Sequence, residues 1–128
     1  MFLLIDSSTP MFHLSLIING KRHDHNWEAG RELARYIHGY IEDRLHEEGK
    51  TWQDIKGIGI FRGPGSYTGL RIGITVANTL AQSLHIPIVG VVGDGWREQA
   101  IALLEAGATN QIVLPEYGGE AHITTPKK

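Results

Sequence analysis

Residues 63–69, with the sequence Gly-Pro-Gly-Ser-Tyr-Thr-Gly, have the composition of a phosphate-binding loop. The segment follows an apolar run that predicts a buried strand, and it precedes a run with helical periodicity. Glycines in such a place allow a tight turn, and the free amides at the start of a helix attract anions. The residues suited to capping the helix or holding an anion there are Gly63, Gly65, Ser66, Thr68, Gly69 and Arg71.

Two standard phosphate-binding motifs do not fit this loop. A P-loop requires a lysine after its last glycine, where this chain has Leu70. A dinucleotide fingerprint requires G-x-G-x-x-G, and the step from Gly65 to Gly69 is one residue too long. The alternative is that the glycines serve only to pack a strand closely against a helix. Both interpretations stay open from the residues alone.

The metal-binding side chains are limited to histidine and carboxylate, because the chain has seven histidines and no cysteine. His23 and His25 alternate along a predicted strand, so both point to one side, which suits a metal ion. The spacing offers no third ligand. We therefore expect no metal site and interpret the histidines as structural or solvated.

Asp6, at the end of the first predicted strand, raises the alternative of an RNase H-like nuclease. Such a site needs several carboxylates around two metal ions. Glu32 or Glu42 on the first predicted helix could be a second ligand, but the strand at 55–61 carries none. We therefore do not expect a nuclease, and we interpret Asp6 as a residue that orders the following turn.

The hydrophobic periodicity predicts an α/β protein with a mixed, five-stranded sheet and helices on both faces. Asn19-Gly20 predicts a hairpin, Gly49 and Gly107 predict helix ends, and Asp94 predicts a helix N-cap. This order of three antiparallel strands followed by parallel strands and helices is that of the RNase H-like fold and of one actin-like ATPase lobe. We expect one lobe over 1–114 and a tail over 115–128. The expected strands are 2–5, 11–18, 21–27, 55–61 and 87–92, with a short further strand at 111–114, and the expected helices are 30–48, 68–84 and 95–105.

The helix at 68–84 is apolar on more than one side, so one side can face the sheet while another needs cover. We predict that a partner subunit covers that other side. The alternative is that the helix lies deep in the chain's own core. On this helix the predicted interface residues are Leu70, Ile72, Ile74, Val76 and Leu80.

The overall composition is that of an ordinary soluble domain, with 41% hydrophobic and 20% charged residues. The formal net charge of −2 gives no global field that would attract nucleic acid, so any role in RNA biology would pass through a partner. No apolar run approaches the roughly 20 residues of a membrane span. We expect a cytoplasmic protein without membrane association.

Three segments resemble one known family. Residues 62–73, Arg-Gly-Pro-Gly-Ser-Tyr-Thr-Gly-Leu-Arg-Ile-Gly, resemble the signature of the TsaB (YeaZ) family. Residues 4–9, Leu-Ile-Asp-Ser-Ser-Thr, are similar to that family's opening motif, and residues 86–91 are similar to the strand that follows the signature helix. The resemblance covers about residues 1–100.

The resemblance implies a non-catalytic scaffold subunit in the synthesis of threonylcarbamoyladenosine, beside the anticodon of tRNAs that read ANN codons. It implies pairing with a TsaD-like catalytic subunit through the helices at 30–48 and 68–84, an additional TsaE-like ATPase, and a possible homodimer. On the helix at 30–48 it implies the interface residues Leu33, Tyr36, Ile37 and Tyr40. No cofactor is expected on this chain itself, whereas ATP and a metal ion are expected on the partner subunits. The chain would meet tRNA only through the complex and would not be an enzyme on its own.

The resemblance also implies a second lobe, for which residues 93–128 leave little room. Residues 115–117, Pro-Glu-Tyr, resemble the family's C-terminal P-x-Y, which implies a large internal deletion. The remaining alternative is an independent actin-like ATPase or small-molecule kinase. That alternative needs two lobes around a nucleotide, and we expect only one here.

Overall fold

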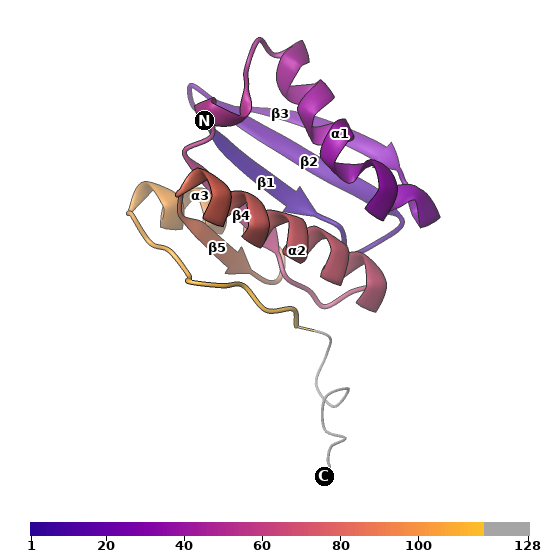
Figure 1. Ribbon diagram of the computed structural model, residues 1–128. Helices are drawn as coiled ribbons and strands as arrows, with labels where there is room; N and C mark the ends of the chain where they lie inside the picture. Colours follow the sequence, from indigo (N-terminus) through magenta and orange to yellow (C-terminus); the bar gives the residue numbers. More distant parts are fainter. Residues whose placement is uncertain (117–128) are drawn as a thin grey trace.

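Five strands form one mixed sheet in the computed structural model, which describes residues 1–116 (Figure 1). Their order across the sheet is β3-β2-β1-β4-β5. The first three strands pair antiparallel, and β4 and β5 continue the sheet parallel to β1. The expected five-stranded α/β fold is therefore confirmed. The strands are β1 (Phe2–Asp6), β2 (Met11–Ile18), β3 (Lys21–Glu28), β4 (Gly57–Phe61) and β5 (Ile88–Val91).

The hairpin between β2 and β3 turns at the predicted pair. Asn19 and Gly20 both have positive φ, 52° and 78°, and the register places Ile18 opposite Lys21. A two-residue turn with positive φ at both positions matches the twist of the strands that it joins. The hairpin prediction is confirmed.

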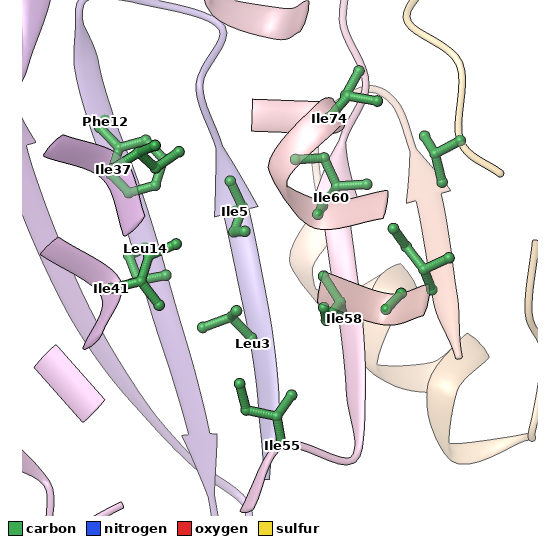
Figure 2. Packing of buried hydrophobic residues seen from close by; sticks show 14 of the residues in the cluster. Leu3, Ile5, Phe12, Leu14, Ile37, Ile41, Ile55, Ile58, Ile60 and Ile74 are labelled. Atoms are coloured by element: carbon green, nitrogen blue, oxygen red, sulfur yellow. The ribbon is translucent and has the colours of Figure 1, made fainter. Parts of the chain in front are cut away.

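Helices cover both faces of the sheet (Figure 1). A short 3₁₀ turn at Gly30–Glu32 leads into α1, and α1 and α2 pack on one face, while α3 packs on β4 and β5 from the other. Figure 2 shows Ile37 and Ile41 of α1 over Phe12 and Leu14 of β2. The helices are α1 (Leu33–Glu47), α2 (Tyr67–Leu84) and α3 (Trp96–Glu105).

Two predictions about the C-terminal part are wrong. Residues 111–114 form no strand, since only Asn110 makes an isolated bridge, to Ile88. Asp94 is not the N-cap of α3; the cap is Gly95, in the left-handed region at φ 73° and without a side-chain hydrogen bond. The chain must turn through positive φ there, which glycine does at little cost and aspartate does less readily.

An edge segment, residues 109–116, takes the place of the expected last strand and runs beside β5 (Figure 1). Its side chains satisfy the strand's free amides. The Ile88 amide donates to Thr109 Oγ1 at 3.2 Å, and the Gly90 amide donates to Asn110 Oδ1 at 2.9 Å. The segment thus blocks the exposed edge of the sheet without extending it.

Val113 anchors the edge segment in the main core, where its side chain is 3% exposed. Asn78 of α2 donates to the carbonyl of Val113 and accepts from its amide, each at 3.0 Å. These two bonds explain why residues 111–114 form no strand, because the Val113 backbone pairs with a side chain and not with β5. The Glu116 amide then donates to the Arg62 carbonyl, so Pro115 and Glu116 stay against the lobe, and residues 117–128 lie outside the described part.

The approach of α2 to the sheet depends on Gly73. A Cβ at this position would meet Ser7 Oγ and would lie 2.8 Å from Ser7 Cβ. Ser7 is fully buried and donates from its hydroxyl to the Gly69 carbonyl at 2.7 Å, so it has no free direction in which to move. Gly73 therefore sets how closely the helix lies to the end of β1.

We predict opposite effects for alanine at two helical glycines. Gly73→Ala should lower the free energy of unfolding by about 1–3 kcal/mol through overpacking. Gly39→Ala, in α1, meets nothing within 4 Å and should raise it by about 0.5–1 kcal/mol through helix propensity. Urea denaturation of both variants measures this. Equal changes in unfolding free energy for Gly73→Ala and Gly39→Ala would contradict the close packing at Ser7.

Asn78→Ala should release the edge segment. The variant leaves the amide and carbonyl of Val113 unpaired next to the core, which should cost about 1–3 kcal/mol of unfolding free energy. Thr79→Ala, at the exposed neighbouring position, is the matched control and should cost much less. A loss no greater than that of the control would show that the segment does not depend on Asn78.

Candidate functional site

The glycine-rich loop lies between the end of β4 and the start of α2, against the turn that follows β1. The Ser66 amide donates to the Ser8 carbonyl at 2.9 Å. Ser66 is also the N-cap of α2, and its hydroxyl accepts from the Gly69 amide at 3.3 Å. The structure thus assigns the cap to Ser66 and not to Thr68.

The glycines of the loop are in close contact with neighbouring backbone. A Cβ on Gly65 would lie 2.5 Å from Ser8 Cβ and 2.8 Å from the Ser8 carbonyl oxygen. A Cβ on Gly69 would meet the Ser7 carbonyl oxygen, and one on Gly63, at φ 119°, would meet the Glu116 carbonyl oxygen. These contacts support the structural interpretation of the loop.

The amides at the start of α2 are largely engaged within the chain. Those of Ser66, Gly69 and Leu70 already donate to Ser8, Ser66 Oγ and the Ser66 carbonyl. An incoming anion would therefore compete with existing hydrogen bonds. Anion binding by this loop stays a prediction.

Thr68 and Arg71, predicted as part of the anion loop, lie in the first turns of α2 and face α1 across an open hollow. With Ala34 of α1 and three further residues of α2, they line an open hollow that we call the helix groove. The Arg71 guanidinium lies over the Tyr67 ring, 5.5 Å from its centroid. The helix groove is lined by Ala34, Thr68, Arg71, Ile72, Thr75 and Val76.

Four of the predicted interface residues are inside the core. Leu33, Ile37, Leu70 and Ile74 are at most 5% exposed and pack between the helices and the sheet. Their side chains stabilise this chain and are not available to a partner. The helical periodicity could not separate them from the outward residues, because both faces of α2 are apolar.

The other five predicted interface residues remain accessible to different degrees. Tyr36 is 49% exposed, and Ile72, Val76 and Leu80 are half-buried along α2. Tyr40 is half-buried and stacks on Trp27 at 4.8 Å between ring centroids. The predicted interface did not include Ala34 and Thr75, whose small side chains line the helix groove.

A second hollow lies at the carboxyl ends of β1, β4 and β5. Asp6 and Ser8 line it on one side, and Asp94, Gly95 and Arg97 line it on the other. The Asp6 carboxylate is engaged in its own turn, because Oδ1 accepts from the Ser8 amide at 2.9 Å and the Ser8 hydroxyl at 2.6 Å. This is the turn-ordering role expected of Asp6.

The other carboxylates considered for a nuclease, Glu32 and Glu42, do not line the hollow that Asp6 lines. Glu42 accepts from the indole nitrogen of Trp52 at 3.1 Å, and Glu32 belongs to the 3₁₀ turn. Within residues 1–116 no three histidine, aspartate or glutamate side chains are grouped so that they could hold a metal ion.

His23 and His25 both approach the end of α1. Their ring nitrogens lie 3.5 and 3.8 Å from Glu48 Oε2. On the opposite side of β3, Asp24 accepts from the Ser15 hydroxyl at 2.7 Å and from Arg22 Nε at 3.1 Å. Burial would raise the pKa of Asp24, but these hydrogen bonds from Ser15 and Arg22 outweigh it and hold the pKa below its usual value. These groups join β3 to its neighbours.

No helix in the described part of the chain is both long enough and apolar enough to cross a membrane.

Comparison with known proteins identifies the family. The family model described as "TsaD: tRNA N6-adenosine threonylcarbamoyltransferase" matches residues 27–93, which include α1, the glycine-rich loop and α2. The chain is 36% identical over 89 residues to the tRNA threonylcarbamoyladenosine biosynthesis protein TsaB of Escherichia coli K12, a match that covers 70% of this chain and 38% of that protein.

A catalytic-type relative and a solved structure give the same result. The tRNA N6-adenosine threonylcarbamoyltransferase of Syntrophotalea carbinolica is 36% identical over 95 residues, covering 74% of this chain and 28% of that protein. The structure of YeaZ from Pseudomonas aeruginosa superposes with a TM-score of 0.69 and 32% identity, over 84% of this chain and 50% of that one. The chain thus spans half or less of the proteins that it matches. By sequence, by family model and by fold, it belongs to the TsaB/YeaZ group of the TsaD family.

Proposed function

We propose that this chain is a non-catalytic partner subunit in the synthesis of threonylcarbamoyladenosine in tRNA. In this role it pairs with a TsaD-like catalytic subunit, joined by a TsaE-like ATPase, in the cytoplasm. ATP and a metal ion belong to the partner subunits, and tRNA is bound by the whole complex. The observation that carries the proposal is the family signature, residues 62–73, whose outward side chains border the helix groove.

The helix groove supports pairing through α1 and α2. Ile72 and Val76 are half-buried on the outer side of α2, and Ala34 faces them from α1. The helix carries one charged side chain, Arg71, in 18 residues. A largely apolar groove between two helices is the kind of surface that a partner helix fills.

Asp6, the carboxylate considered for catalysis, is engaged within its own turn. Its carboxylate is bonded to Ser8, and the chain within residues 1–116 groups no three ligands for a metal ion. We assign catalysis in the proposed pathway to the subunit that this chain contacts.

A second function is favoured by the hollow at the carboxyl ends of β1, β4 and β5. Such a position is where open α/β sheets bind ligands, and the first turn of α3 has no side-chain cap there. An independent ATPase or kinase would use it. Incubation of the isolated chain with ATP separates the two functions, because a scaffold should release no phosphate alone and an ATPase should.

Ile72→Asp should disrupt the complex. The carboxylate would replace an apolar side chain at the predicted contact and would lose water when the partner binds, so binding to the TsaD-like subunit of the same genome should weaken at least about tenfold. Light scattering coupled to size exclusion, with the two proteins mixed, measures the complex. The tRNA of cells that depend on the variant should lose threonylcarbamoyladenosine in parallel, as nucleoside mass spectrometry would show.

Ala102→Asp is the matched control, because Ala102 is exposed on α3, on the other face of the sheet. It should bind and function as the unchanged chain does. Circular dichroism melting of both variants checks that the fold is retained. An Ile72→Asp variant that is folded and still forms the complex would refute pairing through the groove.

A further inference from the structure

The helix groove is bordered by positive charge alone. Another hollow, distinct from the one at the carboxyl ends of the strands, adjoins the helix groove at the start of α1. It shares Thr68 and Ile72 with the groove. Arg31 lines the hollow at the start of α1, and Arg71 lines the helix groove. No aspartate or glutamate lines either of them. We call the two hollows together the docking surface.

Arg31 and Arg71, which line the docking surface, have no carboxylate partner, whereas three of the five other arginines in the described part of the chain do. Arg22, Arg44 and Arg62 each lie within 4.0 Å of a carboxylate. In residues 1–116, Arg31 and Arg71 have no ion pair. Their charges therefore remain available to an incoming group.

Aromatic side chains accompany these charges. Arg71 lies over the ring of Tyr67, and Arg35, next to Ala34 in sequence, lies over the ring of Tyr36 at 5.3 Å. Tyrosine and arginine are the side chains most often found to dominate binding energy at protein interfaces. Both pairs stand at the same end of the two helices, near the glycine-rich loop.

The charges also indicate which partner fits. In a symmetric dimer the same patch lies on both sides of the interface. A second copy would therefore bring arginines and no carboxylate to the docking surface. The apolar lining by Ala34, Ile72 and Val76 and the net charge of −2 do not favour RNA, which needs a denser positive field.

We propose that the docking surface selects an acidic partner: it receives a helix whose apolar side chains contact Ile72 and Val76 and whose carboxylates pair with Arg31 and Arg71. The inference rests on the proposed function and adds the chemistry of the partner. The proposed charge pairing also predicts that the chain binds the acidic partner more tightly than it binds a second copy of itself.

Charge reversal tests the pairing. The dissociation constant for the TsaD-like subunit of the same genome is measured by calorimetry for the unchanged chain, Arg31→Glu and Arg71→Glu. Each reversal should weaken binding about tenfold or more, and Arg71→Gln should weaken it less. Lys56→Glu makes the same change in net charge at an exposed position just before β4, and it should leave the affinity unchanged.

Salt provides a second readout. Raising the salt concentration from about 50 to about 500 mM should weaken binding of the unchanged chain, because exposed ion pairs are screened. The double variant of Arg31→Gln and Arg71→Gln should lose this dependence, whereas the double variant of Arg31→Glu and Arg71→Glu should invert it, because salt then screens a repulsion. An affinity that does not respond to salt, or reversals that behave like Lys56→Glu, would overturn the acidic-partner inference and leave the proposed pairing intact.

Other outcomes overturn the inference in distinguishable ways. If the unchanged chain does not bind the TsaD-like subunit at all, the proposed function fails together with it. If the isolated chain binds tRNA and loses that binding in the two arginine variants but not in Lys56→Glu, the surface is an RNA site. A tight dimer of this chain that persists at high salt would show that a second copy is the occupant.

Discussion

The close contact between the turn after β1 and the start of α2 is the constraint on which the rest of this structure depends. Ser7 and Ser8 stand against Gly65, Gly69 and Gly73, where a side chain would collide with them. The contact brings α2 down onto the centre of the sheet. Once α2 is held there, Leu70 and Ile74 are buried, and Ile72 and Val76 must face away from the sheet.

The edge segment extends this constraint to the C-terminal side of the lobe. Asn78 of α2 binds the backbone of Val113, and Gly63 is in contact with the backbone of Glu116. A helix displaced from Ser7 would therefore also displace the segment that blocks the edge of β5. The lobe protects an edge strand with side-chain hydrogen bonds, where a further strand would have offered a new edge to aggregation.

Most of the fold could be predicted from the sequence, because local signals and tertiary packing agree there. The Asn19-Gly20 hairpin, the helical periodicity and the strand order were sufficient for the sheet and for helices on both faces. The strand at 111–114 could not be excluded, because the side chain that takes its hydrogen bonds, Asn78, is 35 residues away. Likewise, the need for positive φ at Gly95 arises from the path between β5 and α3 and not from the local sequence.

The candidate site was harder to predict, because some residues of the signature at 62–73 pack inside the chain while their neighbours face outward. Gly69, Leu70 and Gly73 face inward and determine packing, whereas Thr68, Arg71 and Ile72 face outward and line the docking surface. A helix turn places these two sets only one or two residues apart. A match to this motif therefore indicates both the fold and the family role. Only the structure shows which of its residues serve packing and which remain accessible to a partner. The inward set makes the contact with Ser7 and Ser8, whereas in the outward set Arg71 has no ion pair in the described residues and Ile72 is only partly buried against the core. Both side chains are therefore accessible to the partner that we propose for the helix groove.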